Sequence, residues 1–115
     1  MHLQNTPPIE LFPIADTEQS WQWLEPGGPV DFTATLNGSA WSAEIAIYRC
    51  GCEVYRAPVA LDAMGYVKAT IPAHVAKALQ SPARIDATYQ IFFTSPIPDM
   101  DTVWVGGVAV HEVQP

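Results

Sequence analysis

Residues 84–94, with the sequence Arg-Ile-Asp-Ala-Thr-Tyr-Gln-Ile-Phe-Phe-Thr, decide the fold. Alternate side chains from Ile85 to Phe93 are apolar or aromatic, and polar side chains fall between them up to Gln90. Because successive side chains of a β-strand point to opposite faces, this period of two predicts a strand with one face buried and the other in water.

Further strands are predicted on both sides of this stretch. Alternation extends over six other segments, at residues 18–24, 30–36, 41–49, 54–61, 66–71 and 102–113. Turn signals separate them, above all Glu-Pro-Gly-Gly-Pro at 25–29 and Asn37-Gly38. Pro58 lies inside one segment, so residues 54–61 are expected at a sheet edge or as an interrupted strand.

Two short glycine-containing segments interrupt the alternation. A bulge or bend is expected at Cys50-Gly51-Cys52, and a bulge at Gly106-Gly107. The two cysteines are expected to remain reduced, because a disulfide across one residue would be strained.

Only one short segment has a helical pattern. Residues 73–80 follow Pro72 and precede Ser81-Pro82, so they can form one or two helical turns. No helix is long enough to connect parallel strands. About seven short strands, with turns about every 8–12 residues, therefore predict an all-β fold: an immunoglobulin-like antiparallel β-sandwich over residues 18–115. A small antiparallel barrel is the alternative.

The first seventeen residues are predicted to form an extended N-terminal arm. Its three prolines exclude a helix. Three apolar residues, Ile9, Leu11 and Phe12, are unusual in a free tail, so the arm either lies on the domain or docks on a partner. We expect these three residues to contribute to binding, and deletion of residues 1–13 to leave the domain folded.

Composition sets limits on function. With 115 residues and 12.6 kDa, the chain fits one domain, and 49% apolar residues are too many for a disordered tail. Twelve acidic and five basic residues give a net charge of −7, which argues against nucleic-acid binding. No segment is long and apolar enough to predict a membrane span, and the first residues have no features of a signal peptide.

Acidic and basic residues are distributed unevenly along the chain, which suggests that they occupy different surfaces of the domain. Residues 1–48 and 85–115 contain acidic residues and no lysine or arginine, whereas all five basic residues fall within 49–84. If the two ends of the chain pair in space, one surface is acidic and another mildly basic. Such a distribution suits head-to-tail packing of copies, or a basic neighbour, although an acidic surface also simply favours solubility.

No arrangement of residues predicts catalysis, a cofactor or a metal site. The three histidines form no acid–base pair by spacing, and Cys50 and Cys52 have neither the spacing nor the second ligand pair of a zinc site. Asp99 and Asp101 have the spacing of a calcium loop but lack its glycine and distal glutamate. Trp21, Trp23, Trp41 and Trp104 are expected in the core rather than on a sugar-binding platform.

Several short segments share features with one family. They include the Gly-Pro turn and Val-Asp-Phe-Thr of residues 28–33, and the segments at 41–49, 64–71, 74–79, 87–91 and 103–113. On these residues, the chain from Trp21 to Val113 resembles small immunoglobulin-like sandwich proteins of tailed-phage virions, which are associated with tails, baseplates and fibres. The resemblance brings no catalytic residues and implies a structural or docking role.

We therefore expect a non-enzymatic virion protein, made in the host cytoplasm, that docks on a tail, baseplate or capsid. Its expected partners are other virion proteins or copies of itself, in an oligomeric assembly without nucleic acid or membrane. The residues expected to bind are Ile9, Leu11, Phe12, Val54, Val59, Asp99 and Asp101. The alternatives are a small acidic inhibitor of a host protein and a carbohydrate-binding module.

Overall fold

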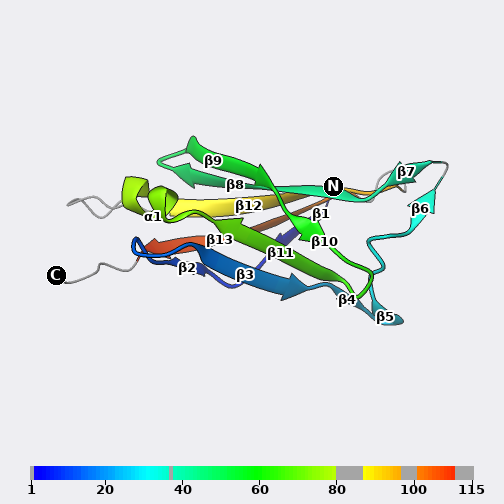
Figure 1. The fold of residues 1–115 in the computed structure, drawn as a ribbon. Coiled ribbons are helices and arrows are strands. Elements are labelled where there is room, and N and C mark those ends of the chain that lie inside the picture. The colour runs from blue at the N-terminus through cyan, green and yellow to red at the C-terminus, as the bar shows by residue number, and fades with distance from the viewer. Residues whose placement is uncertain (1, 37, 80–86, 97–100, 111–115) are drawn as a thin grey trace.

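Two β-sheets pack face to face as a sandwich (Figure 1). The computed structural model describes residues 2–36, 38–79, 87–96 and 101–110. The large sheet contains β1 (His2–Asn5), β2 (Ile9–Leu11), β8 (Ser42–Arg49), β9 (Cys52–Pro58), β12 (Ala87–Thr94) and β13 (Thr102–Val110). The small sheet contains β3 (Thr17–Gln22), β10 (Ala60–Leu61) and β11 (Tyr66–Ile71).

Two hairpins lie at one end of the sandwich and a short helix lies at the other (Figure 1). The hairpins pair β4 (Leu24–Glu25) with β5 (Gly28–Pro29), and β6 (Thr35–Leu36) with β7 (Ser39–Ala40). The helix α1 (Ala73–Leu79) begins after Pro72, as predicted, and the Asp16 carboxylate accepts a hydrogen bond from the Ala73 N–H at 2.9 Å. This contact ties the start of the helix to the segment before β3.

The strand predicted at residues 84–94 is confirmed over its described part as β12, and it lies in the middle of the large sheet. β12 pairs with β8 on one side and with β13 on the other, in the order β1-β13-β12-β8-β9. Its side chains Tyr89, Ile91 and Phe93 are buried, and the polar side chains between them face outward or lie half-buried. The predicted inward residue Ile85 lies outside the described residues.

Trp104 is buried in the core, as predicted, and Trp21, Trp23 and Trp41 are partly buried and pack against the core. The Trp104 ring lies 4.6 Å from that of Phe93, and the Trp23 ring lies within 6 Å of four other aromatic rings, including Phe32 and Trp41. Most of these pairs are edge-to-face or tilted, which is the favourable geometry for aromatic side chains. This cluster joins the two sheets.

The predicted interruption near Pro58 is confirmed, because the chain changes sheets there. β9 ends at Pro58 in the large sheet and β10 begins at Ala60 in the small sheet. Between them, the Val59 N–H donates to the Ala43 carbonyl at 3.2 Å.

The strand directions differ from the prediction at one edge. β1 and β2 both run parallel to β13, so the sandwich is not wholly antiparallel. The arm enters the sheet beside a strand about one hundred residues away, and local sequence patterns carry no information on such a pairing. The finer assignment to an immunoglobulin-like sandwich stays a prediction.

The prediction of a bulge at Gly106-Gly107 is wrong. The register between β12 and β13 is continuous there, with Tyr89 opposite Gly106 and Thr88 opposite Gly107. A Cβ atom on Gly106 would lie 2.5 Å from the Tyr89 ring, whereas one on Gly107 would meet no atom within 4 Å. Gly106 therefore provides space for a neighbouring aromatic ring.

The turn at Cys50-Gly51 joins β8 and β9 with two residues. Both residues have positive φ, 53° and 80°, and Arg49 pairs with Cys52 across them. This backbone geometry is typical of a tight hairpin turn. The bulge lies further along β9, where Val54 falls between the paired residues Glu53 and Tyr55.

The two adjacent glycines allow a matched test. Gly106→Ala should lower the free energy of unfolding by about 1–3 kcal/mol, because the added methyl group must displace the Tyr89 ring. Gly107→Ala should leave stability unchanged or raise it by about 0.5–1 kcal/mol, since alanine loses less conformational entropy on folding. Equal losses in urea denaturation of the two variants would contradict the role given to Gly106.

Candidate interaction surfaces

The N-terminal arm belongs to the large sheet. Both β1 and β2 pair with β13: His2, at the start of β1, lies opposite Thr102, and Ile9, at the start of β2, lies opposite Val108. The Ile9 and Leu11 side chains are 0% and 1% exposed, so they are core residues. The prediction that these two residues bind a partner is corrected: within this chain their side chains are already packed. Deletion of residues 1–13 would remove both side chains from the core, so it should destabilise the domain rather than leave it intact. Phe12, the third predicted residue, is 43% exposed.

Tyr89 fixes the arm between β1 and β2. Its hydroxyl donates to the Pro7 carbonyl at 2.7 Å and is hydrogen-bonded to the Thr6 hydroxyl. In the latter bond Thr6 donates to Tyr89; the Thr6 N–H donates to the Val105 carbonyl at 2.9 Å, and the Thr6 hydroxyl oxygen lies 3.1 Å from the same carbonyl oxygen. Burial raises the pKa of Tyr89, and the hydrogen bond with Thr6 partly opposes this shift. The phenol thus serves as a neutral hydrogen-bonding group beneath the arm.

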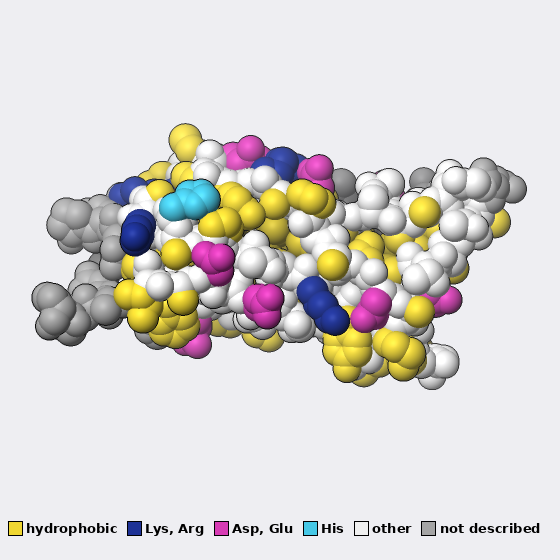
Figure 2. Space-filling model, in the orientation of Figure 1, with side chains coloured by type: hydrophobic (Ala, Val, Ile, Leu, Met, Phe, Trp, Pro, Cys, Tyr) yellow, Lys and Arg dark blue, Asp and Glu magenta, His cyan; other side chains and the backbone are white. Residues whose placement is uncertain are grey.

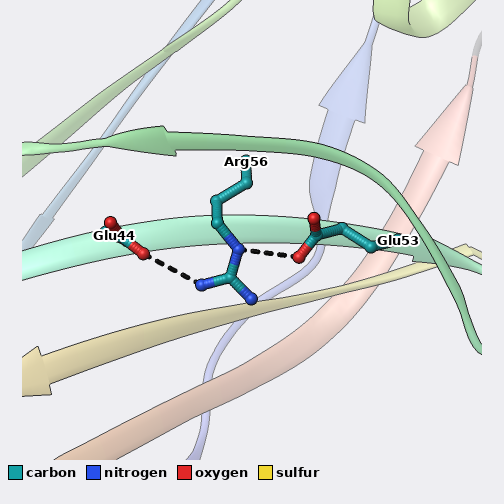
Figure 3. A network of polar contacts seen from close by, with 3 residues as sticks. All are labelled: Glu44, Glu53 and Arg56. Atoms are coloured by element: carbon teal, nitrogen blue, oxygen red, sulfur yellow. Dashed lines mark hydrogen bonds and ion pairs between the residues drawn. The ribbon is translucent and has the colours of Figure 1, made fainter.

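β9 forms the predicted sheet edge. Its Val54 side chain is exposed, and Val59, which follows the strand, is half-buried. Figure 3 shows an ion-pair network on this edge. Arg56 donates from Nε to Glu53 at 2.7 Å and from Nη1 to Glu44 of β8 at 2.9 Å. Both hydrogen bonds raise the pKa of Arg56, which stays charged.

The β9 edge carries three features that oppose pairing with another strand. Val54 forms a bulge, Pro58 has no N–H, and the charged side chains around Arg56 lie along the edge. Natural sheet edges use these same features to prevent edge-to-edge association. A partner at this edge would therefore contact side chains rather than extend the sheet.

The predicted acidic loop is described only at its end. Asp101 is exposed, and its carboxylate accepts a hydrogen bond from the Ser95 N–H at 3.0 Å. This contact closes the loop between β12 and β13. Asp99 lies outside the described residues, so its prediction stays a prediction.

Acidic and basic side chains are interspersed on the face drawn in Figure 2. The two ends of the chain do pair, as the charge argument required, because β1 and β2 lie beside β13. Several basic residues are engaged within the chain: Arg56 is ion-paired, and Arg49 donates to the Ala78 carbonyl of α1. The face in Figure 2 thus does not have the single sign of charge expected of a separated surface.

Cys50 and Cys52 are both free and exposed at the hairpin between β8 and β9. Among residues 2–36, 38–79, 87–96 and 101–110, no three His, Cys, Asp or Glu side chains are grouped so that they could hold a metal ion. Over the same part of the chain, no helix has the length and apolar character needed to cross a membrane.

Two apolar patches lie at opposite ends of β3, and sequence reasoning missed all of their residues except Phe12. The first patch is formed by Phe12 and Ile14, which precede the strand. The second patch is formed by Leu24, which follows it, and by Met64 and Tyr66. Within the second patch, a hydrogen bond of 2.8 Å from the Trp23 N–H to the Gly65 carbonyl holds the segment of Leu24 beside the segment of Met64 and Tyr66. Figure 2 shows hydrophobic side chains gathered towards both ends of this face.

A pocket of about 440 Å³, also missed, lies between β1 and the end of β3. We call it the indole pocket. Its lining includes three tryptophans and three amide side chains: Trp21, Trp23, Trp104, Gln4, Asn5 and Gln22. The only signal in the sequence was the Trp-Gln-Trp alternation of β3, since the other walls come from distant segments.

Comparison of the chain with protein-family models and with curated proteins found no match.

Substitution of two leucines in the arm tests whether the arm is part of the core. Leu11→Ala should lower the free energy of unfolding by about 2–5 kcal/mol, because it leaves a cavity in the core. Leu3→Ala is the control: this side chain is 71% exposed, and its loss should change stability by less than about 0.5 kcal/mol. If both variants unfold at the wild-type urea concentration, the arm is not part of the folded core.

Proposed function

We propose that the protein is a non-enzymatic structural component of a tailed-phage virion, in which it docks on neighbouring proteins, including copies of itself. The resemblance of residues 21–113 to small virion sandwich proteins supports the class. The observation that carries the proposal is the position of the two apolar patches at opposite ends of an elongated domain, whose principal extents are 51 × 25 × 24 Å.

The patches suit a head-to-tail contact between copies. Two different surfaces that bind each other generate rings or filaments, whereas one self-complementary surface generates a closed dimer. A head-to-tail contact would bring Lys68, which lies over the Tyr66 ring of the second patch at 5.9 Å from its centroid, towards Asp16, which follows the first patch. Asp62 and Glu25 also border the second patch. Opposite charges at the edge of an apolar contact favour one orientation.

The β6–β7 hairpin offers a further contact at the second-patch end. It projects from the sandwich (Figure 1), and its Leu36 side chain is exposed. Contacts of this kind use preformed surfaces and need no catalytic group. The burial of Ile9 and Leu11 leaves Phe12 and Ile14, at the end of the arm, and the second patch as the expected partner contacts.

Charge substitutions in the two patches test the head-to-tail contact. Ile14→Asp in the first patch and Met64→Asp in the second should each abolish the self-association that the wild type shows with rising concentration in sedimentation experiments. An equimolar mixture of the two variants should form dimers but nothing longer, because one intact patch remains on each chain. Thr70→Asp, at an exposed position outside both patches, is the control.

Two results would count against the proposal. A wild-type chain that stays monomeric at all concentrations, or single variants that associate as the wild type does, would exclude this contact. Mass spectrometry of purified virions from the phage that encodes the chain should detect the protein, and its absence would contradict a structural role.

A further inference from the structure

We propose that the indole pocket binds a neutral sugar residue. The pocket lies at the open side of the sandwich, where β1 is the edge of the large sheet and β3 is an edge of the small sheet. Its volume of about 440 Å³ falls within the range of roughly 300–1,000 Å³ typical of small-molecule sites. The inference is independent of the proposed role in assembly.

The aromatic wall is held rigid by the core. The Trp23 ring packs at 5.3 Å from Phe93 and at 5.6 Å from both Trp41 and Trp104. The Trp21 ring packs at 5.7 Å from Tyr89. Rings that are already fixed lose little entropy when a ligand binds. Indole groups offer a flat apolar surface against which the C–H groups of a pyranose ring can pack.

The polar side of the pocket matches hydroxyl groups. Gln4 lies opposite Trp104 in the register of β1 and β13, so its amide is on the face of the indole rings. An amide both donates and accepts hydrogen bonds, as a hydroxyl does. Two of the lining groups are oriented by the protein. The Gln22 amide donates to the Met64 carbonyl at 3.0 Å, and the Glu25 carboxylate accepts from the Trp23 indole N–H at 2.7 Å.

The charges of the pocket restrict the ligand class. No lysine or arginine is among the residues that line it, and Glu25 contributes a carboxylate. An anionic ligand such as a phosphate, a nucleotide or an acidic sugar would be repelled. A neutral hydroxylated ligand uses the amides and the indole faces without that cost.

The experiment uses the full chain and free sugars as probes. Glucose, galactose, mannose, rhamnose and N-acetylglucosamine are titrated separately to millimolar concentrations. The indole N–H signals of the tryptophans and the amide signals of residues 4, 5 and 22 are followed by NMR. We expect saturable shifts of these signals with at least one sugar. No shift with any of the five would overturn the proposal.

Substitutions locate the binding site. Gln4→Ala should weaken binding several-fold, up to about tenfold, because a hydrogen-bonding group on the face of the indole rings is lost. Gln19→Ala, on the same strand as Gln22 but outside the pocket lining, should bind as the wild type does. Unchanged affinity in a folded Gln4→Ala variant would place the sugar elsewhere and overturn the proposal.

Met64→Asp separates this proposal from the assembly role. The substitution lies outside the pocket lining, so this variant should still bind the sugar even though it no longer self-associates. Binding that disappears only when self-association is lost would show that sugar contacts depend on a second copy, and would contradict a pocket contained within one chain.

Discussion

The packing of Tyr89 beneath Gly106 is the constraint on which the rest of the structure depends. The ring occupies the space that a side chain at position 106 would need, and the hydroxyl reaches the arm at Thr6 and Pro7. The central strand is thereby linked to the strand beside it and to the arm. With the arm fixed, Ile9 and Leu11 complete the core and β1 becomes the sheet edge.

This arrangement determines which surfaces remain for function. One edge of the large sheet, at β9, is protected by a bulge, a proline and the Arg56 ion pairs. The opposite edge, at β1, leaves a gap to the small sheet, and the indole pocket lies there. The ends of the domain carry exposed apolar side chains. Assembly through the ends and ligand binding at the side therefore use separate surfaces, apart from Leu24, which contributes to both.

Features set by local pattern could be predicted from the sequence. The alternation in β12, the hairpin around Gly38, the helix after Pro72 and the change of sheet near Pro58 all depend on neighbouring residues. The tryptophans were assigned to the core because large apolar rings are costly to expose.

Features set by contacts between distant segments could not be predicted. Ile9, Glu10 and Leu11 alternate as a strand does, but their partner β13 is about one hundred residues away. Gly106 resembles a bulge position until the Tyr89 ring is placed beside it. The walls of the indole pocket likewise come from β1, β3 and β13, so no single stretch of sequence indicated it.

The central claim is that the arm is an integral part of the sheet, and amide hydrogen exchange tests it most directly. The Thr6 N–H, bonded to the Val105 carbonyl, should exchange as slowly as the amides of β12, because both open only when the domain unfolds. Exchange of the Thr6 amide at the rate of an unstructured peptide, while β12 stays protected, would contradict the account.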